Sequence, residues 1–259
     1  MEKYTQGMYP VIRKQTLARE IYDYTVYCPE IAQAAVCGQF VDIAAKGHLL
    51  RRPISLCGID REKGTIRIVF EVRGEGTAEI ARINEGDMID IIAPLGGHGF
   101  DLLDKSRKAV AVGGGIGTPP LVPIAQHYGK NITVISGFRS ANAVILQDDF
   151  KAVGAETILC TDDGTAGRKG FVTDALAELL EREKPDIIYA CGPMVMMKKV
   201  AEAAQAHDVR CQVSLEERMG CGVGACLVCA CRIKLDGGER YAHVCKDGPV
   251  FDSREVIFQ

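Results

Sequence analysis

The sequence predicts a multidomain protein of α+β and α/β class, as three features indicate. Residues 1–100 consist of short β-branched or alternating runs separated by turn residues, which indicates an antiparallel β-barrel. Residues 101–213 alternate buried-type strands with helical stretches, the pattern of a doubly wound parallel sheet. Residues 214–259 are rich in cysteine and lack regular periodicity, so we expect a small C-terminal domain held by a metal or by its neighbours.

Within the first domain, the clearest strand signals are the runs YTVYC (24–28), TIRIVFEV (65–72) and DMIDIIAPL (87–95). In the second domain, strands are expected at 108–114, 131–137, 156–162, 186–192 and 209–215. Helical periodicity is clearest over 171–184 and 193–207. Strands and helices that alternate in this way form βαβ units, and such sheets bind ligands at the carboxyl ends of their strands.

Charge and hydropathy exclude several classes of function. The net charge is −3 and no dense tract of lysine and arginine occurs, so we expect no nucleic-acid binding. No run of about eighteen apolar residues occurs, so we expect no membrane span. The N-terminus has no apolar export signal, which predicts a cytoplasmic protein in a compartment that disfavours disulfides. Of the eleven cysteines, we expect most of the six scattered ones to be inert core residues: Cys28, Cys37, Cys57, Cys160, Cys191 and Cys211.

A glycine-rich turn follows the strand expected at 108–114. In AVGGGIGTPPL (111–121), glycines would let a phosphate approach the backbone, and amides at the start of a following helix would donate to it. The candidate nucleotide contacts are Gly115, Gly117 and Thr118. The pattern departs from G-x-G-x-x-G because position 120 is proline, and a purely structural tight turn would also explain it.

A second candidate turn ends the strand expected at 186–192. It consists of Cys191, Gly192, Pro193 and Met194. These residues lie where parallel sheets bind ligands, and a small thiol followed by glycine leaves room for a flat ring. The alternative is an ordinary strand-to-helix turn with proline at the first helical position.

Two motifs in the first domain have the chemistry to bind a flavin nucleotide. LRRPISL (50–56) offers Arg52 to a pyrophosphate and Ser55 to a flavin edge. GEGT (74–77) is expected to open an amphipathic helix, with Thr77 as its N-cap and Gly76 allowing an anion to approach. The alternative is a solvated arginine on a surface strand beside a capped helix.

In combination, R-P-x-S, G-x-G-T, G-G-G-x-G-T-P and C-G-P-M resemble the ferredoxin–NADP reductase superfamily. The resemblance covers residues from about 5 to 213. It implies that the barrel binds a flavin and that the α/β domain binds a nicotinamide nucleotide.

The cysteine cluster has the spacing Cys221-x4-Cys226-x2-Cys229, and Cys245 follows at a distance. This is the C-x4-C-x2-C…C pattern of plant-type [2Fe–2S] proteins. Glycines in the loop leave amide N–H groups free to point at sulfur, which helps to set a reduction potential. Structural zinc is the first alternative, but it commonly uses paired C-x2-C knuckles and only one such pair occurs here. A disulfide is the second alternative, and a reducing compartment disfavours it.

Cys231 competes with Cys245 for the role of fourth ligand, since it would complete a set of four thiolates from one segment. The [2Fe–2S] pattern takes its fourth thiolate from a distant segment. We therefore assign Cys245 as the ligand and Cys231 as a neighbouring core residue.

SLEERMGCGVGACLVCACR (214–232) and HVCKDGPVF (243–251) resemble the iron–sulfur electron-transfer subunits of class 1B dihydroorotate dehydrogenases. The resemblance spans essentially the whole chain. It implies FAD and one [2Fe–2S] cluster in this chain, with NAD(H) as substrate. It also implies a separate catalytic subunit that contains FMN and converts dihydroorotate to orotate in pyrimidine biosynthesis, in a heterotetramer with two copies of each chain.

Carried over to this sequence, the resemblance implies flavin contacts at Arg52, Pro53, Ile54, Ser55, Val69, Phe70, Glu71, Gly76 and Thr77. The implied cluster ligands are Cys221, Cys226, Cys229 and Cys245. A basic residue can occupy the position of Glu71 in this family. The carboxylate of Glu71 cannot bind a phosphate, so this chain departs from the family there.

The implied chemistry belongs to the cofactors. NADH gives up two electrons at once as a hydride, whereas a [2Fe–2S] cluster carries one, so the flavin must release its pair in two steps. No side-chain acid, base or nucleophile is predicted. The histidines are expected to be surface or structural residues: His48, His98, His127, His207 and His243.

Two other functions stay open at this point. One is a flavin and iron–sulfur subunit that oxidises NAD(P)H in another complex, such as a sulfhydrogenase or an electron-bifurcating transhydrogenase. The other is a redox-sensing protein that only binds nucleotide. The choice of nucleotide is also open, because Arg139 is suited to a 2′-phosphate whereas the family resemblance and the nearby Asp162 and Asp163 favour NAD.

Overall fold

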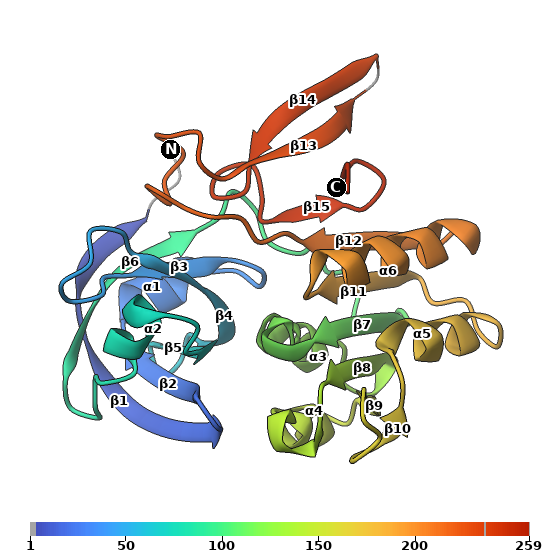
Figure 1. Cartoon of the computed structure of the whole chain (residues 1–259), viewed down its shortest axis with the longest axis horizontal. Helices are drawn as coiled ribbons and strands as arrows, with labels where there is room; N and C mark the ends of the chain where they lie inside the picture. The colour runs from blue at the N-terminus through green and yellow to red at the C-terminus, as the bar shows by residue number, and fades with distance from the viewer. Residues whose placement is uncertain (1–3, 236, 259) are drawn as a thin grey trace. The chain divides into compact units, whose positions relative to one another are not determined.

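A computed structural model of the chain describes residues 4–235 and 237–258. It confirms the predicted fold class, with a closed antiparallel barrel and a largely parallel sheet (Figure 1). The chain packs as two compact units. The barrel unit comprises the chain up to Gly99 together with Glu216–Cys231 and Tyr241–Pro249. The sheet unit comprises Phe100–Leu215, Arg232–Arg240 and the residues from Val250 onward. The cysteine-rich segment thus contributes to both units, and the boundaries 1–100, 101–213 and 214–259 stay a prediction.

The barrel has six antiparallel strands in the order β1-β2-β5-β4-β3-β6. They are β1 (Thr5–Ala18), β2 (Ile21–Tyr27), β3 (Phe40–Ile43), β4 (Arg52–Asp60), β5 (Thr65–Glu71) and β6 (Met88–Leu95). Alternate side chains fill the interior, as the period of two requires. Fully buried examples are Val11, Tyr24, Val41, Ile66, Ile68, Ile89 and Ile91.

Two short helices accompany the barrel: α1 (Pro29–Ala34) and α2 (Glu75–Ile80). Helix α2 is held to the barrel by the buried phenol of Tyr24, which donates to the carbonyls of Ile80 at 3.0 Å and Ile83 at 2.7 Å. The GEGT turn at its start is therefore fixed relative to the strands.

The sheet unit has seven strands in the order β10-β9-β8-β7-β11-β12-β15. They are β7 (Ala109–Gly114), β8 (Ile132–Phe138), β9 (Glu156–Thr161), β10 (Arg168–Lys169), β11 (Ile187–Cys191), β12 (Arg210–Ser214) and β15 (Val250–Asp252). All are parallel except β15, which pairs antiparallel with β12. Every strand predicted in this domain is confirmed, but the pairing of β15 with β12 was not predicted, because local periodicity does not show which strands pair.

The helices of the sheet unit are α3 (Val122–Tyr128), α4 (Gln147–Ala152), α5 (Val172–Leu180) and α6 (Met194–Ala206). Four 3₁₀ turns lie among the strands and helices of this unit: η1 (Gly115–Gly117), η2 (Pro119–Leu121), η3 (Gly129–Asn131) and η4 (Ala141–Ala143). The strand order reverses at β7, because β8 lies on one side of it and β11 on the other. This is the point where open parallel sheets bind ligands.

After β12 the chain enters the cysteine-rich segment. Its regular structure is a two-stranded sheet of β13 (Ala230–Leu235) and β14 (Gly238–His243). The ligand candidates Cys221, Cys226 and Cys229 precede β13 in irregular backbone, and Cys245 follows β14.

Strand β3 is unusual because both of its faces are buried. Val41 and Ile43 point into the barrel core, as their place in the apolar cluster shows. Phe40 and Asp42 alternate with them and point outward, yet they are only 3% and 2% exposed. The cysteine-rich segment covers this outer face, with Gly222 against the carboxylate of Asp42.

Asp42 has a perturbed pKa. Burial raises the pKa of its carboxyl from 3.8 to about 6, although the positive charges of Arg51 and Arg52 act to lower it. Because the pKa is higher in the folded state, folding favours the neutral carboxylic acid. Ionisation between pH 3.8 and about pH 6 therefore costs stability as the pH rises.

We expect Asp42→Asn to raise the free energy of unfolding above pH 6 by about 1–3 kcal/mol, because the amide removes a buried charge. Below pH 3.8 the gain should vanish, since the wild-type carboxyl is then neutral in both states. Urea unfolding of both proteins across this pH range measures the difference. Asp60→Asn, at a carboxylate that pairs with Lys63 at the surface, is the control and should give no gain. A difference that does not change with pH would contradict the assignment to ionisation.

Candidate functional site

The predicted flavin-binding strand is β4, whose first residues pair with β3. The register joins Arg52 to Ile43 and Ser55 to Phe40, with Pro53 and Ile54 between them. The guanidinium of Arg52 lies directly on Gly76, so that a Cβ atom at Gly76 would overlap it. The fold thus brings together the R-P-x-S and G-x-G-T motifs, which are more than twenty residues apart in the sequence.

The prediction that Thr77 caps the following helix is wrong. Helix α2 begins at Glu75 with Gly74 as its N-cap, so Thr77 is the third helical residue. Its hydroxyl accepts hydrogen bonds from the N–H groups of Arg73 at 2.9 Å and Gly74 at 3.2 Å. It also donates to the Gly74 carbonyl at 3.0 Å. The hydroxyl therefore closes the turn from within the helix.

The residues of β5 are placed in different ways. Phe70 is in the barrel core, edge-to-face with Tyr24 at 5.2 Å between ring centroids, and Val69 is also buried. A ligand could reach these two only through their backbone. Glu71 forms an ion pair with Arg73 at 2.7 Å. The acidic residue that departs from the family pattern therefore has an arginine beside it.

The two predicted nucleotide turns meet at the carboxyl ends of β7 and β11. The sheet register pairs Gly113 with Cys191. Gly117 packs against the backbone of Cys191 and Gly192 so closely that a Cβ atom would overlap it. Gly114 in turn lies against Pro193, where a Cβ atom would come within 2.9 Å of Cδ. Glycine is required at position 117 because two main chains approach each other there.

Gly115 is different, since no described residue outside its own turn would lie within 4 Å of a Cβ atom there, and its φ is +54°. It faces open space at the end of β7. Thr118 is fully buried beneath the turn, and its Oγ1 has no hydrogen-bond partner among the described residues. Met194 is the first residue of α6, with Pro193 as the N-cap. Open backbone at Gly115 beside a buried hydroxyl at Thr118 suits a polar ligand.

The four candidate ligands of the cluster form two pairs of thiols. In one pair, the Cys226 N–H donates to Cys221 Sγ at 3.3 Å and the Cys226 thiol also hydrogen-bonds that sulfur. In the other, Cys229 Sγ and Cys245 Sγ are 3.3 Å apart. Each pair holds two sulfurs that are separated in the sequence, and the second joins residues on either side of the β13–β14 hairpin.

Backbone amides point at these sulfurs. Ala225 N–H donates to Cys221 Sγ at 3.2 Å, and Gly224 N–H donates to Cys245 Sγ at 3.2 Å. Burial acts to raise the pKa of the Cys221 thiol, but hydrogen bonds from Val223 and Cys226 outweigh it and lower the pKa to about 7. Burial raises the pKa of Cys245 to about 12. Metal binding at Cys245 must therefore release its proton.

This donor set fits a two-iron cluster, in which each iron takes two thiolates and amides donate to sulfur. Among residues 4–235 and 237–258, no three side chains of His, Cys, Asp or Glu converge as ligands of a single metal ion. The paired arrangement favours the cluster over the zinc alternative.

Cys231 lies on β13 and is buried. In the described structure its sulfur is not part of the contact between Cys221 and Cys226 or of the contact between Cys229 and Cys245. Among the scattered cysteines, Cys28, Cys57, Cys160 and Cys211 are buried, as predicted. All eleven cysteines lie among the described residues, and none forms a disulfide.

Three of the histidines bond to backbone carbonyls: His98 to Gly99, His127 to Leu103 and His207 to Ala203. These contacts agree with structural roles. His243 lies beside the cluster segment, with Nδ1 3.6 Å from Asp247 and a buried Nε2 that has no partner among the described residues.

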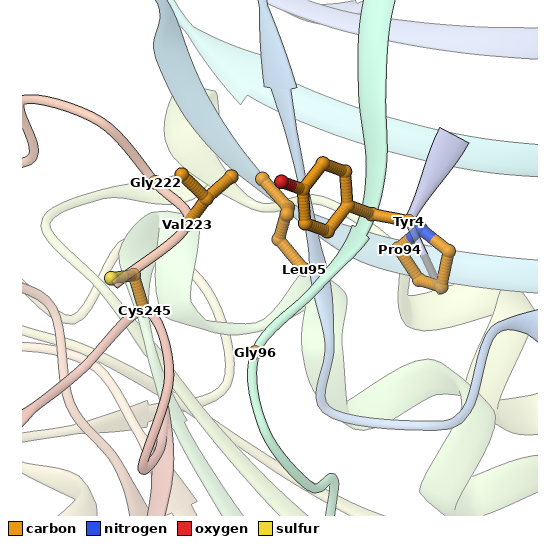
Figure 2. A pocket seen from close by; sticks show the side chains of 7 residues that line it. All are labelled: Tyr4, Pro94, Leu95, Gly96, Gly222, Val223 and Cys245. Carbon is orange, nitrogen blue, oxygen red and sulfur yellow. The ribbon is translucent and has the colours of Figure 1, made fainter. Parts of the chain in front are cut away.

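A small pocket lies beside the cluster segment within the barrel unit (Figure 2). Its lining residues are Tyr4, Pro94, Leu95, Gly96, Gly222, Val223 and Cys245. The side chains of Tyr4 and Leu95 lie on the barrel side and Cys245 on the other. Sequence reasoning missed this pocket and the neighbouring Asp42. The signal for Asp42 was a single acidic residue in the apolar run FVDIAA (40–45).

Two segments of the chain match known family models. Residues 111–202 match the family described as "Oxidoreductase NAD-binding domain". Residues 216–257 match the "Iron-sulfur cluster binding domain of dihydroorotate dehydrogenase B".

Solved structures support the same fold. The structure of an NADH-dependent reduced ferredoxin-NADP oxidoreductase, described for flavin-based electron bifurcation, is 33% identical. The match covers 97% of this chain and 90% of that chain, with a TM-score of 0.84. The Amycolatopsis cytochrome P450 reductase GcoB is 22% identical over 80% of this chain and 67% of its own, with a TM-score of 0.68, and shows the fold alone.

Barrel, nucleotide-binding sheet and paired thiols together define an oxidoreductase of the ferredoxin-reductase fold with an iron–sulfur segment. The "Dihydroorotate dehydrogenase B (NAD(+)), electron transfer subunit" of Bacillus cereus strain B4264 is 40% identical over 95% of this chain and 96% of its own length. The Bacillus anthracis strain A0248 protein of the same name is 39% identical over the same shares. The chain belongs to the family of dihydroorotate dehydrogenase B electron transfer subunits.

Membership confirms the predicted cofactor classes: an iron–sulfur cluster, a nicotinamide nucleotide and the flavin of the ferredoxin-reductase fold. It also confirms that the chain is a subunit of a larger oxidoreductase. None of the helices in the described part of the chain combines the length and hydrophobicity needed to cross a bilayer.

We expect Gly76→Ala to weaken flavin binding at least about tenfold, because the added methyl group would displace the Arg52 guanidinium. Flavin absorbance per chain after gel filtration measures the loss. Gly74→Ala is the matched control, since Gly74 has extended backbone and the described structure places no residue beyond its chain neighbours within 4 Å of the added carbon. Equal flavin retention in the two variants would show that the Arg52–Gly76 contact does not contribute to flavin binding.

Proposed function

We propose that this chain passes electrons between NAD(H) and the FMN of a separate catalytic subunit that interconverts dihydroorotate and orotate, a step of pyrimidine biosynthesis. The observation that carries the proposal is the barrel unit itself. It holds both the Arg52–Gly76 contact and two pairs of thiols in one compact body. The name shared by the relatives supports the identity of the reaction.

The chain's own residues bind and orient the cofactors. We assign FAD contacts to Arg52, Pro53, Ile54, Ser55, Val69, Phe70, Glu71, Gly76 and Thr77, with Val69, Phe70 and Thr77 contributing main chain. We assign the nicotinamide nucleotide to Gly115, Gly117, Thr118, Cys191, Gly192, Pro193 and Met194. We assign the [2Fe–2S] cluster to Cys221, Cys226, Cys229 and Cys245.

The bound flavin would supply the exchange between two-electron hydride transfer and one-electron transfer. The protein contributes position and surroundings. Arg52 is suited to a pyrophosphate because its guanidinium is fixed on Gly76. The amides of Gly224 and Ala225 are suited to stabilise negative charge on sulfur. No side chain of the site is assigned as an acid, base or nucleophile.

The partner is proposed to dock at the cluster loop. Leu227 and Val228 lie between the ligands Cys226 and Cys229 and are 76% and 56% exposed. Two exposed apolar side chains beside a redox centre fit a surface that another chain covers. We propose a heterotetramer of two electron-transfer and two FMN-containing catalytic subunits.

NAD is the proposed nucleotide. The relatives are named for NAD(+). Beside the second strand of the sheet, Arg139 is exposed, and the carboxylate of Asp163 is already bonded to the hydroxyl and N–H of Thr165. One arginine without a basic neighbour in this loop is a weak site for a 2′-phosphate.

A second candidate is favoured by the 33% identity to the bifurcating NADH-dependent oxidoreductase. In that case the partner would be a larger flavoprotein. Co-purification distinguishes the two, because the proposed function requires an FMN protein with dihydroorotate activity. A chain that only senses redox state would not show rapid bleaching of its flavin by NADH.

We expect the purified chain to oxidise NADH with artificial acceptors at multiple turnovers, because the hydride acceptor and the one-electron outlet are in one polypeptide. It should not oxidise dihydroorotate until the FMN subunit is added. NADPH should be turned over more slowly than NADH. Stopped-flow absorbance and an orotate assay measure these rates. Dihydroorotate turnover by the chain alone would contradict the division of labour.

We expect serine at Cys221, Cys226, Cys229 or Cys245 to abolish the [2Fe–2S] signal, while Cys231→Ser retains it. Iron analysis and electron paramagnetic resonance of the reduced protein measure the cluster, and flavin content is the internal control for folding. Loss of the cluster in Cys231→Ser with retention in Cys245→Ser would reverse the assignment of the fourth ligand.

A further inference from the structure

The outer face of β3 joins the two redox sites of the barrel unit. Asp42 pairs with Pro53 of the flavin-binding strand on one side and with Ile92 of β6 on the other. The loop that carries Cys221 covers its side chain. A Cβ atom on Gly222 would lie 2.7 Å from Asp42 Oδ2 and 3.5 Å from Cγ. The carboxylate is therefore in contact with the residue next to a cluster ligand.

This carboxylate is buried, and no described residue forms an ion pair with it. Oδ1 has no hydrogen-bond partner among the described residues. Of the two nearby arginines, Arg51 forms a bidentate ion pair with Asp90 at 2.9 and 3.0 Å and reaches only the main-chain carbonyl of Asp42. Arg52 donates to the Leu50 carbonyl and lies on Gly76.

A buried carboxylate in this state costs stability, since burial without compensating bonds penalises the charge. An isosteric amide or an apolar residue would fill the same space without that cost. This destabilising burial occurs where β3 packs against the loop that carries Cys221. Costly buried charges of this kind are features of functional sites.

A fixed negative charge beside a redox centre has a definite effect. Reduction adds one negative charge to the cluster, and a nearby carboxylate repels it more strongly in a buried, low-dielectric setting than in water. The thiolates and amides of the loop set the basic affinity for the electron. The carboxylate stabilises the oxidised form of the cluster relative to the reduced form.

We propose that Asp42 is a positioning residue that lowers the reduction potential of the iron–sulfur cluster, through the contact of its carboxylate with the Gly222 segment. The inference rests on the proposed function, in that Cys221, Cys226, Cys229 and Cys245 hold the cluster. A lower reduction potential favours release of the electron by the reduced cluster. Strand β3 thereby helps to set the direction of electron transfer.

The test is a potentiometric titration of the full chain with its cofactors, followed by electron paramagnetic resonance at pH 8, where Asp42 is ionised. Asp42→Asn should favour reduction of the cluster about tenfold, a shift of about 59 mV to more positive potential for a one-electron couple. Asp42→Ser, also neutral but smaller, should shift the potential in the same direction. Asp42→Glu keeps the charge and should stay close to the wild type.

Asp60→Asn is the matched control, because it removes an exposed carboxylate from the β4–β5 turn and should leave the potential unchanged. Iron and flavin contents confirm that each variant is loaded. Loaded Asn and Ser variants with the wild-type potential would overturn the inference and leave the proposed function intact. A wild-type chain that binds no cluster would overturn the proposed function and the inference with it.

Discussion

The double burial of β3 is the constraint on which the sites of the barrel unit depend. A strand whose two faces are both apolar or unsolvated must be covered on both, and the barrel core covers only one. The cysteine-rich segment covers the other through Gly222. A hydrogen bond from Gly97 N–H, just after β6, to the Gly248 carbonyl at 2.7 Å holds the segment to the barrel. Because β4 pairs with β3, the same packing places the thiol loop near the strand that begins at Arg52.

Close approach of other groups to the main chain of a glycine is common to the sites. At the sheet, Gly117 allows the turn after β7 to touch the end of β11. At the barrel, Gly76 accepts the guanidinium of Arg52 and Gly222 accepts the carboxylate of Asp42. In each case a side chain is absent so that a polar group can occupy its place. This explains why the motifs that identified the chain are motifs of glycine as much as of charged residues.

Local patterns predicted the barrel and the strands of the sheet, because these depend on the periodicity of apolar residues. The spacing of the cysteines predicted an iron–sulfur segment, because it reflects the number of ligands. These local patterns failed where distant segments decide the outcome. Thr77 was misplaced because the N-cap is set by where the turn after β5 ends, at Gly74. The pairing of β15 with β12 and the contact of Asp42 with Gly222 join residues far apart in sequence. One acidic residue in an apolar strand was the only sign of the latter.

The position of β15 has a consequence for how the iron–sulfur segment is held. β12 and β15 are hydrogen-bonded neighbours, joining Gln212 to Asp252 and Ser214 to Val250, so the whole cysteine-rich segment is an excursion between two adjacent strands. Its two ends are held by the sheet itself, and formation of the sheet offsets the entropy of closing the loop. The segment is therefore a loop tethered at both ends, in which the thiols of residues far apart in the sequence are held together.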